Sequence, residues 1–218
     1  MNNKSDTNLI REYCKKHQNE IFDVCLMSNL FRDIPLSNFR KYVSRLVEES
    51  VLTPLSKGVY YIGTNPSDNI DLAIEKCYLQ PFQGRPIKET LLYELGIIED
   101  EPKTKTYLIH WGLGNKKVLN YQLVDTHNFE LVYGNKKLRL LDLIACEKMI
   151  SEDDYPKFTI ELMKLAKDYD DSKDGGDYIV EYPQWVYLRL ANLLDAMHIS
   201  NRVKQDYDNK TENSNRSK

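Results

Sequence analysis

The chain has 218 residues, of which 41% are hydrophobic and 29% are charged, which suits one large or two small globular domains. No run of about 18 apolar residues occurs and no apolar secretory signal is found at the start, so we expect a cytoplasmic protein without a membrane partner. The four cysteines and four histidines lie far apart, at no metal-ligand spacing. This predicts reduced, mostly buried thiols, no metal site and no cofactor.

Charge is unevenly distributed along the chain. Residues 1–65 contain nine Lys/Arg and seven Asp/Glu, a balance of +2, whereas the remainder contains 21 and 26, a balance of −5. Any surface that attracts a polyanion is therefore expected in the N-terminal part.

The first 65 residues show the element order of a winged helix-turn-helix. Apolar residues recur at helical spacing over residues 7–17, and Asp23 is a suitable N-cap for a second helix. After a turn that contains proline, residues 37–49 predict a third helix with Ser37 as its N-cap and its apolar residues on one side. Two apolar runs over residues 52–63, interrupted by Ser-Lys-Gly, predict a β-hairpin.

The pattern changes after a linker-like Asn-Pro-Ser-Asp segment near residue 65 and predicts an α+β domain with a small antiparallel sheet. Its predicted strands cover residues 106–110, 118–124 and 129–133, and its predicted helices cover residues 68–79, 86–95, 137–150, 155–169 and 183–198. The expected organisation is a winged helix-turn-helix domain (residues 1–65), an α+β domain (residues 66–203) and a disordered polar tail (residues 204–218).

The third helix and the hairpin tip carry residue types that bind DNA. A helix-turn-helix places one helix in the major groove, where arginine pairs with guanine and lysine neutralises phosphates. Arg40 is expected at the side of this helix, and one of Tyr60 and Tyr61 is expected to contact DNA while the other braces the hairpin. The predicted DNA-binding residues are Ser37, Asn38, Arg40, Lys41, Ser44, Arg45, Lys57, Gly58 and Tyr60.

A solvated helix surface or a protein-binding winged helix is the alternative interpretation of the same residues. Glu48 and Glu49 favour it, because carboxylates repel phosphates. Their position at the C-terminal end of the helix, away from the turns that enter a groove, favours DNA.

Residues 170–181 match the spacing of an EF-hand calcium loop. Asp177 stands where an apolar residue normally pairs two such loops, and Pro183 interrupts the helix that should follow. An acidic loop between helices is therefore the preferred interpretation.

Two groups of polar residues could be taken for catalytic sets: Asp125 with His127, and Asp142 with Glu147 and Lys148. Neither follows a recognised catalytic spacing, and no nucleophile elbow or phosphate-binding glycine loop occurs. A protein that is not an enzyme is therefore expected.

Four aromatic residues suggest an alternative function, a ligand-responsive transcriptional repressor. Trp111, Tyr121, Tyr133 and Trp185 would line its ligand pocket. Aromatic residues at such positions are more often part of a core.

The motifs of the N-terminal part resemble the N-terminal domain of the AbiEi-type antitoxins. The similar segments are Phe-Arg-Asp-Ile at residues 31–34, residues 37–52 and Leu-Ser-Lys-Gly-Val-Tyr-Tyr at residues 55–61. Ser50 stands where this family commonly has glycine. Residues 91–96 and the Leu-Leu-Asp-Leu segment at residues 140–143 resemble, more weakly, the family's C-terminal domain.

The resemblance implies an antitoxin of a type IV toxin–antitoxin pair that acts in abortive phage infection. Such a protein represses its own operon by binding inverted repeats in the promoter through its winged helix. It also counteracts a nucleotidyltransferase-like toxin without a stable complex, and its C-terminal domain is needed for that activity.

Overall fold

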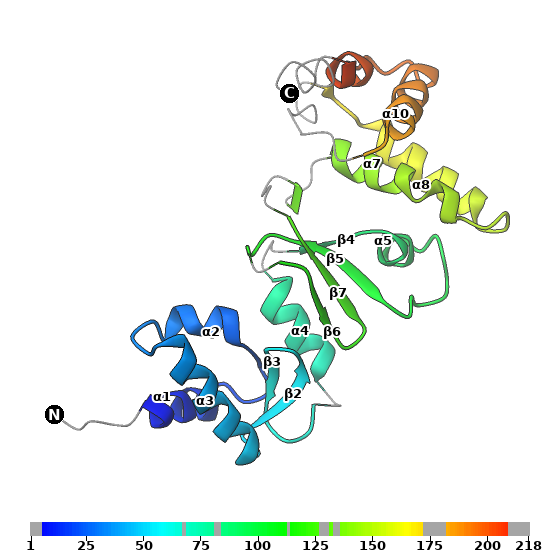
Figure 1. Cartoon of the computed structure of the whole chain (residues 1–218). Coiled ribbons are helices and arrows are strands. Elements are labelled where there is room, and N and C mark those ends of the chain that lie inside the picture. Colours follow the sequence, from blue (N-terminus) through cyan, green and yellow to red (C-terminus); the bar gives the residue numbers. More distant parts are fainter. Residues whose placement is uncertain are drawn as a thin grey trace.

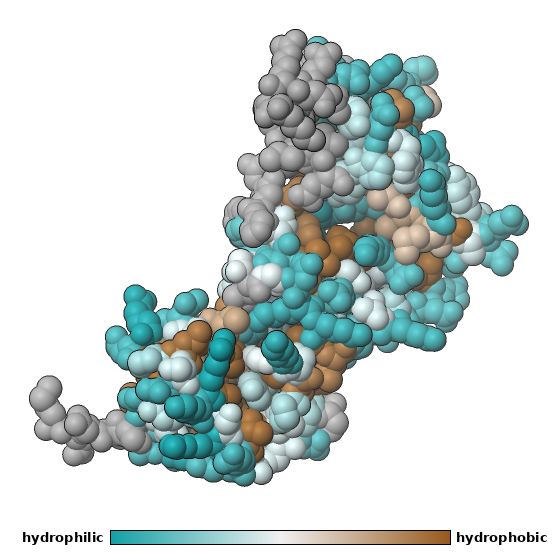
Figure 2. Space-filling view, viewed as in Figure 1, coloured by the Kyte–Doolittle hydropathy of each residue, from teal (hydrophilic) through white to brown (hydrophobic). Residues whose placement is uncertain are grey.

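A computed structural model describes residues 6–66, 69–80, 84–112, 114–126, 131–132, 136–171 and 182–208. The chain forms three successive parts: an N-terminal unit of helices and a small sheet, a middle unit built on a second sheet, and a C-terminal unit of helices (Figure 1). The fold is α+β, as the sequence predicts. Hydrophilic residues cover most of the face in Figure 2, and hydrophobic residues are visible between the middle sheet and the C-terminal helices and in smaller patches on the N-terminal unit.

The N-terminal unit combines helices with a three-stranded antiparallel sheet of order β1-β3-β2. Its elements are α1 (Asp6–Lys16), β1 (Ile21–Asp23), α2 (Val24–Leu30), α3 (Leu36–Glu48), β2 (Leu52–Ser56) and β3 (Val59–Ile62). Phe22, Phe39 and Leu46 are fully buried in its core. The helices and the hairpin occupy the positions that the sequence predicts, and β1 extends the predicted two-stranded ribbon to three strands.

The N-terminal end of α3 differs from the prediction. The helix begins at Leu36, and its N-cap is Pro35, two residues before the predicted N-cap Ser37. The Pro35 carbonyl accepts hydrogen bonds from the backbone N–H groups of Asn38 and Phe39, both at 2.9 Å. Ser37 is therefore an exposed residue of the first helical turn and caps nothing.

The C-terminal end of α3 is a Schellman motif with serine in the left-handed position. Ser50 has φ +58°, its N–H donates to Val47 O at 3.0 Å, and Val51 N–H donates to Leu46 O at 2.9 Å. Glycine is the usual residue here because it adopts positive φ without a steric penalty. Serine adopts the same turn, so the hairpin still begins directly after the helix.

The middle unit contains a four-stranded sheet of order β4-β5-β7-β6. Its elements are α4 (Ile70–Tyr78), β4 (Gly84–Pro86), α5 (Glu89–Glu94), β5 (Lys105–Ile109), β6 (Lys116–Val118) and β7 (Tyr121–Asp125). The β4–β5 and β6–β7 pairs are antiparallel, but β5 and β7 are parallel, whereas an antiparallel sheet was expected. The sheet is therefore mixed.

The predicted single strand over residues 118–124 is in fact a hairpin. Leu119 has φ +53°, which turns the chain between β6 and β7. β7 lies beside β5, and β6 takes the outer position. The turn contains neither glycine nor proline, so these two turn signals do not mark it in the sequence.

The C-terminal unit consists of α7 (Lys136–Ala145), a short 3-10 helix (Glu147–Met149), α8 (Tyr155–Lys167) and α10 (Gln184–Ala196). These helices share a core in which Phe158, Leu190 and Leu194 are fully buried. The three predicted helices of this region are confirmed within a few residues. The strand predicted over residues 129–133 is wrong at residues 131–132, which are helical, while its other residues lie outside the described part.

The tail predicted to be disordered from residue 204 begins as a helix. Residues 203–208 are helical, Val203 is fully buried and the Tyr207 ring lies 5.0 Å from that of Tyr187. Lys137, which is nearly buried, pairs with Asp206 at 3.1 Å. These few apolar contacts hold the segment against the C-terminal helices although its overall composition is polar. Residues 209–218 lie outside the described part.

The N-terminal and middle units share a hydrophobic cluster. Ile21, Val59 and Tyr61 of the first sheet belong to the same cluster as Ile74 and Tyr121 of the middle unit. The domain boundary predicted near residue 65 falls between β3 and α4, whose side chains meet in this cluster.

Candidate nucleic-acid interface

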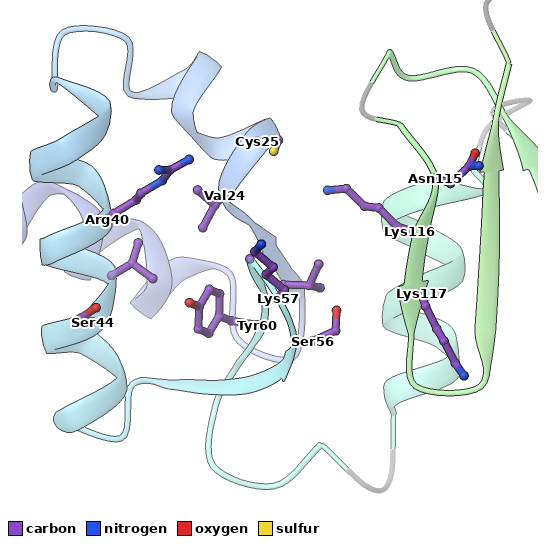
Figure 3. Close-up of a pocket in the computed structure, with 13 residues that line it drawn as sticks. Val24, Cys25, Arg40, Ser44, Ser56, Lys57, Tyr60, Asn115, Lys116 and Lys117 are labelled. Carbon is purple, nitrogen blue, oxygen red and sulfur yellow. The ribbon is translucent and has the colours of Figure 1, made fainter.

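A cleft of about 690 Å³ lies between α3, the β2–β3 hairpin and β6 (Figure 3). It is lined by Val24, Cys25, Arg40, Val43, Ser44, Ser56, Lys57, Gly58, Val59, Tyr60, Asn115, Lys116 and Lys117. Four of these residues are cationic and none is acidic, in a chain whose net charge is −3. The cleft therefore has the charge that attracts a polyanion.

The amphipathic pattern of α3 determines which of its residues line the cleft. Phe39 and Val43 are buried against the core, so Arg40 and Ser44, one turn apart, are directed away from it. Figure 3 shows Arg40 pointing from α3 toward the start of α2. The prediction that Arg40 lies at the side of the helix is thus refined: this side faces the hairpin.

The hairpin tip supplies the floor of the cleft. Gly58 has φ +76° in the turn, and its carbonyl accepts a hydrogen bond from Val24 N–H at 2.9 Å, which ties the tip to the start of α2. Lys57 is exposed beside it. Neither Lys57 nor Arg40 forms an ion pair within the part of the chain that the structure describes, so both charges are available to a ligand.

The predicted DNA-binding residues divide into two groups. Those that line the cleft are Arg40, Ser44, Lys57, Gly58 and Tyr60. Ser37, Lys41 and Arg45 are exposed on α3 outside the cleft, and Asn38 is half-buried. The Arg45 guanidinium lies 5.9 Å from the centre of the Tyr42 ring, a cation–π distance that positions it along the helix.

The two adjacent tyrosines of β3 have different environments. Tyr60 is half-buried and lines the cleft. Tyr61 is 1% exposed, and its hydroxyl donates to Asn19 Oδ1 at 2.9 Å. Tyr61 is therefore the tyrosine that braces the hairpin, and Tyr60 is the one whose ring a ligand in the cleft would meet.

The sequence did not predict that the middle unit contributes to this surface. Asn115, Lys116 and Lys117 form the wall opposite α3 (Figure 3). The feature of the sequence that could have indicated this contribution is the pair of consecutive lysines after a glycine-rich turn. Nothing local in the sequence places them beside the hairpin, because the contact depends on how the two units pack.

A buried carboxylate connects the two walls. Asp23 is fully buried and caps α2, accepting from Cys25 N–H at 2.8 Å, as the sequence predicts. It also accepts from the Tyr78 hydroxyl at 2.6 Å and forms an ion pair with Lys116. Burial, and then the Asp23 charge, raise the pKa of Tyr78 far above its ordinary value of 10.0, so its hydroxyl remains a donor.

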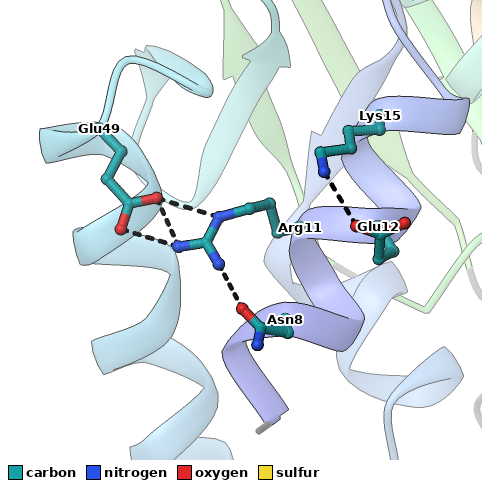
Figure 4. A network of polar contacts seen from close by, with 5 residues as sticks. All are labelled: Asn8, Arg11, Glu12, Lys15 and Glu49. Atoms are coloured by element: carbon teal, nitrogen blue, oxygen red, sulfur yellow. Dashed lines mark hydrogen bonds and ion pairs between the residues drawn. The ribbon is translucent and has the colours of Figure 1, made fainter. Parts of the chain in front are cut away.

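The acidic end of α3 is partly neutralised within the unit. Arg11 on α1 binds Glu49 with two nitrogens, Nη2 at 2.7 and 2.8 Å and Nε at 3.2 Å (Figure 4). Glu48 is exposed and has no ion-pair partner among the described residues. The two carboxylates that favour the alternative interpretation are therefore not equivalent, and the free charge is that of Glu48.

The residue sets considered as catalytic have structural contacts. Asp125 accepts from the backbone N–H groups of Gly114 at 2.7 Å and Trp111 at 3.0 Å, which fixes the turn before β6, while His127 lies outside the described residues. Asp142 pairs with Arg85. Glu147, in turn, binds Arg189 at 3.1 Å.

The three described aromatic residues of the alternative ligand pocket, Trp111, Tyr121 and Trp185, belong to two different hydrophobic clusters. Tyr121 is buried and Trp111 packs against the same cluster, donating its Nε1–H to Tyr78 O at 3.1 Å. Trp185 belongs to the C-terminal core, and Tyr133 lies outside the described residues. The described aromatic residues are thus distributed between two cores.

The EF-hand-like segment at residues 170–181 lies almost entirely outside the described residues. Of its carboxylates, Asp171 accepts from Tyr169 at 2.8 Å and Arg202 at 3.1 Å. Within the described ranges, no cluster of three His, Cys, Asp or Glu side chains could hold a metal ion. The four cysteines are free thiols: two are buried, Cys77 is half-buried and Cys25 is exposed in the cleft.

Comparison with known proteins gives no identification. No family model matches the chain, and no curated protein matches it. None of the helices that the structure describes is both long and apolar enough to cross a bilayer.

Proposed function

We propose that the chain is a winged-helix repressor that binds double-stranded promoter DNA, and that it serves as the antitoxin of a type IV toxin–antitoxin pair. The observation that carries the DNA-binding part is the acid-free cleft between α3 and the hairpin. Its Arg40 and Lys57 form no ion pair with any described residue, and they lie beside the exposed Lys41 and Arg45 of α3. Helix and hairpin together present positive charge on one side of the N-terminal unit.

The element order supports α3 as the recognition helix. The order α1-β1-α2-α3-β2-β3 is that expected of a winged helix, in which α2 and α3 form the helix-turn-helix and the hairpin is the wing. With α3 in the major groove, the exposed ridge of Ser37, Lys41 and Arg45 meets base edges and phosphates. Arg40 and Lys57 then flank the phosphate backbone that passes between helix and wing.

The antitoxin part of the proposal rests on the resemblance of the sequence to the AbiEi-type antitoxins. Under this proposal the middle and C-terminal units counteract a nucleotidyltransferase-like toxin without a stable complex and without catalysing a reaction. The contacts of Asp142 and Glu147 with arginines agree with structural roles for these carboxylates. Binding to inverted repeats would repress the operon that encodes both proteins.

Binding of the purified chain to a fluorescent duplex from its own upstream region, with a shuffled duplex as control, tests the DNA-binding part. We expect tighter binding to the upstream duplex and a loss of at least about 10-fold in the Lys41/Arg45/Lys57 triple alanine variant, since each lost phosphate contact weakens binding and lowers its salt dependence. Equal affinity of the wild type and the triple variant for the upstream duplex would contradict the DNA-binding part of the proposal.

Co-expression with the product of the neighbouring reading frame tests the antitoxin part. We expect the wild type to rescue growth from that product, and the triple variant to rescue it equally while a reporter of the promoter is derepressed. A neighbour that is not toxic, or a toxic neighbour that the chain does not counteract, argues for a repressor without a toxin partner.

A further inference from the structure

The cleft wall opposite α3 belongs to the middle unit and ends in an edge strand. β6 is the outermost strand of the β4-β5-β7-β6 sheet, so no described strand pairs with its outer side through backbone hydrogen bonds. Figure 3 shows Lys116 pointing across the cleft toward the hairpin, whereas Lys117, the next residue of the strand, points away from the hairpin, because successive side chains of a strand alternate. Positive charge thus continues from the N-terminal unit onto the middle unit.

The position of β6 relative to α3 is fixed by buried contacts. Lys116 forms its ion pair with the fully buried Asp23, which also binds the Tyr78 hydroxyl. Val118 of β6 belongs to the same hydrophobic cluster as Val59 of the hairpin. A ligand held by α3 and the hairpin would therefore meet β6 at a defined place.

The two lysines of β6 differ in the availability of their charges. The Lys116 side chain is 14% exposed and its ammonium group is occupied by Asp23. Lys117 is exposed and forms no ion pair with any residue that the structure describes. A lysine on an edge strand also discourages pairing with another sheet, and this is the structural explanation against which a binding role must be tested.

We infer that Lys117 contacts a backbone phosphate of the DNA that α3 and the hairpin bind, so that the DNA interface extends onto the middle unit. The inference rests on the proposed function, since it assumes that the N-terminal unit binds a duplex. A flexible ammonium group on a strand edge neutralises a phosphate without reading bases. Lys117 therefore adds affinity for any duplex and adds no sequence preference.

The test measures the affinity of Lys117→Ala, Lys117→Arg and wild type for the upstream and the shuffled duplex between 50 and 200 mM salt. Lys167→Ala is the matched control, because Lys167 is also an exposed lysine and lies on α8. We expect Lys117→Ala to weaken binding to both duplexes by about 5-fold at the lowest salt and to reduce the slope of log K against log salt by about 0.9. Lys117→Arg is expected to bind like the wild type.

Several outcomes would overturn the inference. If Lys117→Ala binds like Lys167→Ala while the Lys41/Arg45/Lys57 variant is impaired, the N-terminal unit binds DNA alone and β6 does not take part. If Lys117→Ala aggregates but its monomer binds normally, the lysine only protects the sheet edge. If the wild type binds neither duplex, the proposed function fails and the inference fails with it.

Discussion

The ammonium group of Lys116, on β6, is ion-paired with the carboxylate of Asp23, which begins α2 and is fully buried. Removing one partner of a buried pair leaves an uncompensated charge, which is far more costly than losing the pair as a whole. We expect Lys116→Met to lower the free energy of unfolding by about 3 kcal/mol, as measured by urea denaturation.

Further variants distinguish the contribution of the Asp23–Lys116 ion pair from that of the N-cap hydrogen bond that Asp23 accepts. Asp23→Asn keeps an acceptor for Cys25 N–H but carries no charge, so the Asp23→Asn/Lys116→Met double variant should be more stable than Lys116→Met alone. Tyr78→Phe removes a single hydrogen bond and should cost about 1–2 kcal/mol. A Lys116→Met variant as stable as the wild type would contradict this account.

The Schellman turn after α3 gives a stabilising substitution. Ser50 holds φ +58°, a conformation that costs a residue with a Cβ about 1–2 kcal/mol and costs glycine nothing. Part of this gain is offset because glycine has more freedom in the unfolded chain. We expect Ser50→Gly to raise the free energy of unfolding by about 0.5–1 kcal/mol, and Ser50→Ala, the control, not to raise it. Equal stability of the two variants would contradict a steric cost at this position.

The local part of this structure could be predicted from the sequence. The Asp23 cap, the hairpin over residues 52–63 and the buried side of α3 follow from capping chemistry, turn residues and helical periodicity. Each depends on neighbours within one or two turns of the chain. The residue types alone also pointed to Arg40 and Lys57 as cations of the site.

The parts that could not be predicted depend on tertiary contacts. The parallel pairing of β5 with β7 is decided by the order in which strands insert into the sheet, and the turn at Leu119 has no glycine to mark it. The role of Lys116 as partner of Asp23 joins residues 93 positions apart. The helical start of the tail likewise depends on two apolar contacts, those of Val203 and Tyr207.

The two carboxylates at the end of α3 should affect DNA binding differently. Glu48 is unpaired among the described residues and lies on the exposed side, so Glu48→Gln removes a repulsion from phosphates and should tighten binding by about 2–3-fold at low salt. Glu49 is already neutralised by Arg11, so Glu49→Gln should change affinity less. Anisotropy titrations at two salt concentrations provide the measurement, and a larger effect of Glu49→Gln would show that the assignment of the free charge is wrong.

Acid stability should depend on Glu20, which contacts α4 from the N-terminal unit. Hydrogen bonding to Lys76, at 2.7 Å, lowers the pKa of Glu20 below its ordinary value of 4.5, and His17, at 2.9 Å, acts in the same direction. Because the folded pKa is depressed, the stabilisation is complete above pH 4.5 and is lost as the pH falls through the folded value.

The measurement is urea denaturation between pH 3 and pH 7. We expect the free energy of unfolding of Glu20→Gln to be lower than that of the wild type at pH 7 and the two to converge toward pH 3. Glu152→Gln, at an exposed position without an ion pair among the described residues, is the control and should follow the wild type throughout. A constant difference between Glu20→Gln and the wild type at every pH would rule out this linkage.

Cys25 offers a chemical probe of the cleft. It is exposed there, whereas burial raises the pKa of Cys14 and Cys146 to about 11 and, with the charge of Asp23 adding to it, that of Cys77 to about 12. At pH 7.5 a maleimide should therefore modify Cys25 first, since the thiolate is the reactive form and access is required. The adduct fills space between α3 and the hairpin and should weaken DNA binding by at least about 10-fold, through steric exclusion of the phosphates that the cleft would hold.

Two controls make the experiment decisive. Cys25→Ser should bind DNA like the wild type and should keep that affinity after maleimide treatment. Bound DNA should in turn slow modification of Cys25 in the wild type, as followed by mass spectrometry of the intact protein. Full DNA binding by the modified wild type would show that the duplex does not occupy the cleft, because an adduct at Cys25 cannot share that space with a phosphate backbone.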